Sequence, residues 1–309
     1  MFCQNCGKEM SDNAAFCSNC GWLKKSNVSK KGVLKIPKIP KGVLKSAIVV
    51  FGIVIIGLII YNFSKPKGNV YEFKDISDEN MPLAMINTPF WADDVPVDYM
   101  DSVKFGSYPQ SDISGNRKDP IEWIVLDRQD DKVLLLSKYI LDCKCYNNEL
   151  KAVTWETCDL RKWLNNDFYN QAFNGSEQNK IQTTNVINSN NTEHGINGGN
   201  NTNDKVFCLS TDEVERYFYK SNMQNEDKRR ATRGTKYAKN KDNMGKQLDV
   251  VIHKLDKWSS GNSRFWLRSP GENLGFASLV DYNGSLFGFG INVDSPYNGV
   301  RPALWVSFK

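Results

Sequence analysis

Two cysteine pairs near the N-terminus are the strongest chemical signal in the sequence. Cys3 and Cys6 stand in CQNCG, and Cys17 and Cys20 stand in CSNCG. Four thiolates complete a tetrahedral shell for Zn²⁺, and each following glycine allows a tight turn that points backbone N–H groups at sulfur. A closed sulfur shell leaves no position for a substrate, so we expect one structural zinc ion. The alternatives are a redox pair or disulfides, but a duplicated motif in a reducing compartment favours zinc.

Four more cysteines follow much later in the chain: Cys143, Cys145, Cys158 and Cys208. Their even number permits up to two disulfides in an oxidising compartment. The first two form a C-x-C pair, which is too short for an easy bridge to itself, so a disulfide would join either of them to Cys158 or Cys208. Buried thiols that pack as small apolar groups, or a metal held by the C-x-C pair, are the other interpretations.

Catalytic patterns are weak. His194 and His253 are the only histidines, and no serine or cysteine motif accompanies either of them. The acidic residues show no recognisable paired spacing. The sequence therefore gives no support for a Ser-His or Cys-His nucleophile, or for an enzyme in general.

An apolar run is the element that separates the N-terminal cysteines from the rest of the chain. Ala47 to Tyr61 is uninterrupted and uncharged. Such a run makes about 22 Å of helix, and its flanks extend it toward the ~30 Å hydrocarbon core of a bilayer. We therefore expect a single transmembrane helix over 46–63; a buried core helix and a cleaved signal peptide are the alternatives.

The charge distribution predicts the orientation of that helix. Lys24 to Lys45 contribute eight lysines and no acid, and such a basic flank faces the cytoplasm. The chain carries +5 overall, of which residues 1–46 hold +7 and the remainder −2. Because the basic excess reports membrane topology, nucleic acid is not an expected partner.

These observations predict five segments, each with its own role. They are a cytoplasmic zinc ribbon (1–23), a basic juxtamembrane linker (24–45), the transmembrane helix (46–63), a proline-containing tether (64–100) and an extracytoplasmic domain (101–309). The expected localisation is the cell membrane, with the N-terminus in the cytoplasm. A cytoplasmic protein partner of the ribbon is a further expectation.

The external domain has the pattern of an α+β fold, with helices early and antiparallel strands late. IEWIVLD and KVLLLS predict a hairpin around 128–131, and a helix is expected over 157–173. Ser210 and Glu213 form a capping box that predicts a helix start. The polar segment 188–204 predicts a loop. Short strand-like runs divided by glycine and proline fill the last 45 residues.

Two resemblances add to this. MFCQNCGKEMSDNAAFCSNCG resembles the minimal zinc ribbon at the start of many bacterial membrane proteins. An uncharacterised bacterial family, catalogued as a domain of unknown function, resembles this chain in the strings FGSYPQ, TWETCDL, WLRSPG and GVRPAL. The C-terminal end of the chain resembles the C-type-lectin-like fold shared with formylglycine-generating enzymes.

The oxidase activity of formylglycine-generating enzymes is not expected, because no cysteine follows Cys208. Calcium-dependent sugar binding is not expected either, because E-P-N and W-N-D strings are absent.

Candidate ligand-binding residues gather near the C-terminus, within or beside these family-like strings. They are Trp266, Arg268, Tyr282, Asn283, Tyr297, Asn298 and Arg301. Aromatic and amide side chains on loops suit carbohydrate, peptide or wall-polymer ligands. The alternative is structural: arginines in terminal strands as buried partners of carboxylates or carbonyls, and aromatics as packing residues.

The function that these patterns favour is a membrane-anchored, extracytoplasmic ligand-binding or sensing protein with a cytoplasmic structural zinc ribbon. Two alternatives remain open. One is a cell-surface enzyme of unidentified chemistry, and the other is an adaptor in a membrane assembly whose ribbon binds the partner.

Overall fold

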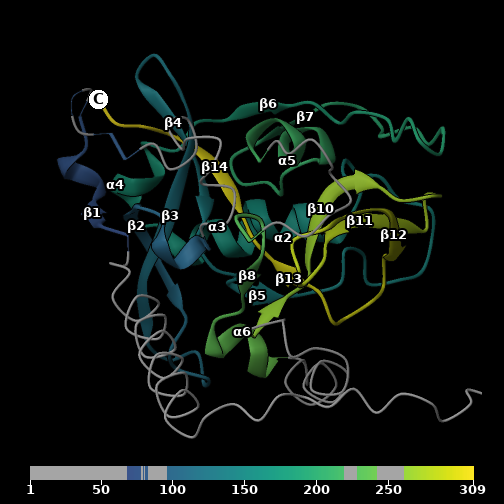
Figure 1. Ribbon diagram of the computed structural model, residues 1–309, viewed down its shortest axis with the longest axis horizontal. Helices are drawn as coiled ribbons and strands as arrows, with labels where there is room; N and C mark the ends of the chain where they lie inside the picture. The colour runs from purple at the N-terminus through teal and green to yellow at the C-terminus, as the bar shows by residue number, and fades with distance from the viewer. Residues whose placement is uncertain (1–67, 78, 80, 83–95, 219–227, 242–260) are drawn as a thin grey trace, which may run out of the picture. The chain divides into compact units, whose positions relative to one another are not determined.

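The computed structural model describes residues 68–77, 79, 81–82, 96–218, 228–241 and 261–309 (Figure 1). The chain divides into two compact units, Met1–Ser64 and Lys65–Lys309. The expected zinc ribbon, basic linker and transmembrane helix at 46–63 fall outside the described residues. Within the ranges that are described, no helix is long and apolar enough to cross a bilayer.

The first sheet has five strands in the order β1-β2-β3-β4-β14. Its strands are β1 (Val70–Glu72), β2 (Ser102–Pro109), β3 (Lys118–Gln129), β4 (Lys132–Ser137) and β14 (Ala303–Ser307). The antiparallel β3–β4 pair confirms the predicted hairpin, and Asp130 adopts a positive φ of 52° in its turn. Figure 1 draws the yellow β14 beside the teal β4, so the end of the chain completes a sheet that begins early.

Part of the predicted tether at 64–100 packs with this sheet. β1 pairs in parallel with β2. The 3₁₀ turn Phe73–Asp75 follows β1, and the 3₁₀ turn Val97–Tyr99 precedes β2. Phe73, Val97 and Met100 are buried. The prolines of this stretch suggested a linker, but its apolar side chains gain more from burial in the core than from exposure.

The second sheet also has five strands, in the order β12-β11-β10-β13-β5. These are β5 (Asp142–Cys143), β10 (Phe265–Pro270), β11 (Phe276–Val280), β12 (Leu286–Asn292) and β13 (Gly299–Val300). The predicted C-terminal strands are therefore confirmed. Two short antiparallel pairs complete the described strands: β6 (Thr184–Val186) with β7 (Thr202–Asp204), and β8 (Thr232–Arg233) with β9 (Asn262–Ser263).

The described α-helices lie between β5 and β10 in the sequence, two strands of the second sheet. The predicted helix over 157–173 is present as α2 (Asp159–Trp163), a π-helical turn η4 (Leu164–Phe168) and α3 (Tyr169–Ala172). The predicted capping box begins α5 (Thr211–Tyr217), with Ser210 as its N-cap. α4 (Gly175–Gln178) and α6 (Lys236–Lys241) are short.

Two details of the predicted pattern are wrong. Strands β2–β4 precede the helices, so strands occupy both ends of the domain and the helices lie between them in sequence. The polar segment 188–204 is not loop throughout, because β7 begins at Thr202. Strands β2–β4 pair consecutively, whereas β7 pairs with β6 across residues 187–201, a partner that local composition does not encode.

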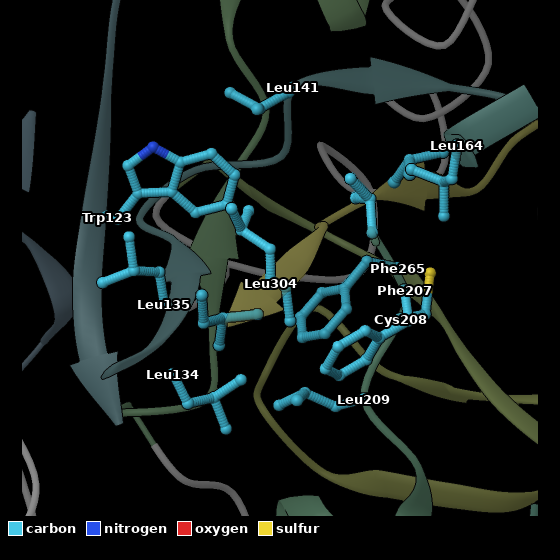
Figure 2. Packing of buried hydrophobic residues seen from close by; sticks show 14 of the residues in the cluster. Trp123, Leu134, Leu135, Leu141, Leu164, Phe207, Cys208, Leu209, Phe265 and Leu304 are labelled. Atoms are coloured by element: carbon cyan, nitrogen blue, oxygen red, sulfur yellow. The ribbon is translucent and has the colours of Figure 1, made fainter. Parts of the chain in front are cut away.

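The core lies where the two sheets and the helices meet. Figure 2 shows side chains from the first sheet, among them Trp123, Leu135 and Leu304, converging with Phe207 and Phe265. All of these residues are at most 3% exposed. The chain passes from the second sheet to the first between β13 and β14, so Arg301 stands at the junction of both sheets.

Candidate functional site

The described part of the chain carries a surface pocket of about 450 Å³. Its walls are the end of β5 with the residues after it, the helical segment α2–η4, and the loop that contains Pro296. This volume falls in the usual range of small-molecule sites. The lining residues are Cys143, Lys144, Cys145, Asn148, Asp159, Leu160, Lys162, Trp163, Asn166, Asp167 and Pro296.

The β5 wall is fixed from behind by the second sheet. Lys144 donates its backbone N–H to the Asn298 carbonyl oxygen at 3.2 Å, and its own carbonyl accepts from Trp266 Nε1 at 2.8 Å. Trp266 and Asn298 are both buried. Two of the residues expected to bind ligand therefore hold the strand that carries the pocket side chains.

The helical wall begins at an unusual cap. The Cys158 sulfur accepts from the Arg161 backbone N–H at 3.4 Å and serves as the N-cap of α2. The π-helical turn η4 follows at once and presents Asn166 and Asp167 to the pocket. Single π turns inside helices recur at functional sites, because the extra residue redirects side chains that a regular helix would point elsewhere.

The carboxylate of Asp159 is held in its ionised form. It accepts from the backbone N–H and the side-chain amide of Asn148, at 3.1 and 2.9 Å, and from Lys162 Nζ at 3.1 Å. The hydrogen bond from the Asn148 backbone and the nearby Lys162 ammonium keep the pKa of Asp159 below its usual range. The pocket therefore keeps a negative charge in mildly acidic conditions.

An aromatic side chain forms the flat part of the same wall. The Lys144 ammonium lies 4.6 Å from the centre of the Trp163 ring, and the ring packs against Phe168 at 5.6 Å. Trp163 is only partly buried. A cation over an indole face is stabilised by about 0.5–2 kcal/mol. This contact positions the Lys144 ammonium without neutralising its positive charge.

Two thiols, one on β5 and one shortly after it, line the pocket. Cys143 donates to the Pro296 carbonyl oxygen at 3.1 Å, and Cys145 donates to the Asp294 carbonyl oxygen at 3.2 Å. Across the described residues, no group of three or more histidine, cysteine or acidic side chains could hold a metal ion. Among the described residues that line the pocket there is no histidine.

The other two described thiols are of a different kind. Cys158 and Cys208 are fully buried thiols in the core. Burial raises the pKa of Cys158 to about 12 and raises that of Cys208 still further. Such thiols are weak nucleophiles, and they pack as small apolar groups.

The seven predicted ligand residues do not line the pocket. Arg268 is 2% exposed and donates to both carboxylate oxygens of Glu213, at 2.5 and 2.8 Å. It also donates to the carbonyl oxygens of Cys208 and Ile187. Arg268 therefore ties β10 to α5 and to the segments that precede α5.

Arg301 is 1% exposed and is bonded to main-chain oxygens. It donates to the carbonyls of Ser137 and Arg230 at 2.8 and 2.9 Å. Burial lowers the pKa of Arg301 to about 9. The guanidinium thus joins the end of β4 to the segment before β8.

The remaining predicted residues lie in turns. Tyr282 and Asn283 are half-buried between β11 and β12, where Asn283 accepts from the Ser285 backbone N–H. Tyr297 is half-buried before β13, beside the buried Asn298, which donates to Ser295 Oγ at 3.1 Å. The sequence did not single out the residues that do line the pocket, except for the C-x-C pair.

The two sheets and their helices define an α+β domain that carries a polar surface pocket. Residues 130–308, more than half of the chain, match the family described as a domain of unknown function, DUF6273. The chain belongs to this family. Residues 2–21 match a zinc-ribbon domain, whose four thiol donors are the expected zinc ligands Cys3, Cys6, Cys17 and Cys20.

No curated protein and no solved structure matches the chain. The C-type-lectin-like fold therefore stays a prediction from the sequence strings.

Proposed function

We propose that this protein is a membrane-anchored receptor whose pocket between β5 and α2–η4 binds a carbohydrate segment outside the cell. The observation that carries the proposal is the composition of the pocket wall. Amides, carboxylates and ammonium groups surround one indole ring in a cavity of about 450 Å³. A hydroxyl group both donates and accepts, so a sugar can pair with all three kinds of polar group.

The lining favours a hydroxyl-rich ligand over an apolar one. Asn148 and Asn166 use their side-chain N–H groups inside the protein, toward Asp159 and the Lys162 carbonyl. Their amide oxygens remain as acceptors for hydroxyl protons. Trp163 supplies a flat apolar surface for the C–H face of a sugar ring, as aromatic side chains do at amphipathic sites.

The rest of the proposed arrangement follows from the sequence. The zinc ribbon at 1–23 holds one structural ion through Cys3, Cys6, Cys17 and Cys20, faces the cytoplasm, and gives a cytoplasmic partner protein a docking element. The helix at 46–63 anchors the chain. Protease added to intact cells should then remove the domain beyond about residue 70 and spare the ribbon; cleavage of the ribbon would contradict this topology.

The binding proposal is tested with a glycan array probed by the full-length protein in detergent. A positive glycan is then titrated against Trp163→Phe, Asp167→Asn and the control Trp305→Phe, whose ring lies on β14 outside the pocket. We expect both pocket variants to weaken binding and the control to retain it. Binding that is equal in all variants, or an array without any signal, would overturn the proposal.

A further inference from the structure

Two exposed phenylalanines stand together on β12, an edge strand of the second sheet. Phe287 is 40% exposed and Phe289 is 48% exposed. Their ring centroids lie 6.1 Å apart, and the rings are tilted by 41°. Single exposed apolar side chains are normal on a protein surface, whereas two adjoining exposed rings mark a candidate contact surface.

A bulge in β12 brings Phe289 to the surface. Residues 287–291 of β12 face only residues 277–279 of β11, so the additional residues bend the strand locally. Gly290 permits the bend with a φ of 72°, and a Cβ at Gly290 would lie only 2.5 Å from the Ala277 carbonyl oxygen. The backbone therefore fixes the position from which the Phe289 ring projects.

A tight turn beside β12 supplies a third ring. Asn191 and Ile196 exchange backbone hydrogen bonds at 2.8 and 3.1 Å, and the Asn191 side-chain amide donates to the Gly288 carbonyl oxygen at 3.0 Å. These bonds fasten the turn to the strand. The His194 ring centroid lies 4.6 Å from that of Phe289, so the imidazole holds the phenyl ring in place.

The same turn places a carboxylate beside the rings. The Glu193 side chain is 59% exposed, and its Oε2 lies 4.0 Å from His194 Nε2. A Cβ on Gly288, the residue between the two phenylalanines, would lie 3.6 Å from the same oxygen. The faces of aromatic rings carry negative partial charge. The carboxylate and the rings therefore attract the same kind of ligand, a cation.

The combination favours an organic cation over other ligands. An apolar partner would remove the Glu193 carboxylate from water without compensation, which costs free energy. A metal ion needs several donors, and no metal-binding group is found among the described residues. A quaternary ammonium ion has a positive charge for the carboxylate and apolar methyl groups for the rings. Such ions bind aromatic faces within about 6 Å of the ring centre, so one ion over the pair can reach both rings.

We infer that Phe287, Phe289 and Glu193 form a surface site for the quaternary ammonium group of a small ligand such as choline. The two rings contact its methyl groups, and Glu193 neutralises its charge. The described lining of the pocket between β5 and α2–η4 contains none of these residues. The site is therefore separate from the carbohydrate proposal, and either can fail alone.

The test is an NMR titration of choline with the full-length protein, in a detergent whose headgroup is not choline. The uncharged analogue, in which carbon replaces the quaternary nitrogen, has the same shape and should bind at least about fivefold more weakly. Phe287→Leu and Phe289→Leu keep an apolar side chain but lose the ring, so each should weaken choline binding about two- to fivefold. Glu193→Gln should also weaken it, most clearly at low ionic strength.

Phe308→Leu is the matched control. The Phe308 ring is half-buried and lies next to Arg128 and Lys309, so its loss should leave choline binding unchanged. A protein that binds no choline, equal binding of choline and its uncharged analogue, or equal affinities in the site variants and the control would each overturn the site. Circular dichroism checks that every variant is folded.

Discussion

Charged side chains line the pocket and also surround two buried arginines, Arg268 and Arg301, but the two regions differ in how those charges are bound. Arg268 and Arg301 are almost fully buried, and each donates through two of its three guanidinium nitrogens. Arg268 donates to Glu213 and to main-chain carbonyls, and Arg301 donates to main-chain carbonyls. In the pocket, Lys144 rests on an indole ring, and Asp159 is partly exposed. A ligand competes more readily for these partly solvated groups, although Asp159 already accepts from Asn148 and Lys162, than for charges that are paired in the buried interior.

This difference separates the structural arginines from the residues that we propose bind a ligand. Arg268 and Arg301 lie in the strings WLRSPG and GVRPAL, and the sequence predicts both as ligand-binding residues. Their geometry supports a role in joining the two sheets and α5. The pocket residues come from segments whose polar character looked ordinary in the sequence.

Replacing Arg268 tests the structural side most strongly. Arg268→Met leaves the Glu213 carboxylate and two carbonyl oxygens without their donor, so we expect a loss of about 2–4 kcal/mol in the free energy of unfolding. Arg216→Met on α5, the helix that Arg268 contacts, is the control, because the Arg216 side chain is 67% exposed. Its exposed ion pair with Asp127 should contribute less than about 1 kcal/mol. Urea denaturation measures both. Equal urea midpoints for Arg268→Met and Arg216→Met would contradict the structural role of Arg268.

Trp266 connects the two regions and should show an intermediate effect. Trp266→Phe leaves the Lys144 carbonyl without its donor, which costs about 1–3 kcal/mol, and it loosens the pocket wall. Trp123→Phe is matched, since Trp123 is equally buried and donates to the Phe105 carbonyl. Both should lose stability by denaturation, but only Trp266→Phe should also lower the affinity for a bound glycan. The same affinity loss in both would mean that the wall is not positioned by Trp266.

Asp159 should show the smallest effect, and one that depends on pH. Its pKa is lower in the folded protein, so the carboxylate stabilises the fold above its unfolded pKa of about 4. This stabilisation is lost as pH falls through the folded pKa. Asp159→Asn should cost less than about 1 kcal/mol at pH 7, and the difference from the unmodified chain should shrink in acid. A difference that grows on acidification would contradict the cause given for the shift.

Local signals predicted the elements that depend on local chemistry. The capping box of Ser210 and Glu213 begins α5 as expected, because both partners lie within one turn. The β3–β4 hairpin follows from two apolar runs around a short turn. The π turn at 164–168 carries no such signature, and it depends on how the helix fits between Tyr108, Phe173 and the strands.

The sequence alone determined the charge partition, the zinc-ribbon match, the β3–β4 hairpin and the start of α5, since residues close together in the chain encode them. Only the tertiary structure decided which polar residues meet. Cys143, Asp159 and Pro296 come from three distant segments that share one pocket, while Arg268 and Arg301 turn inward. Burial sorts these groups, and burial depends on contacts between residues far apart in the chain.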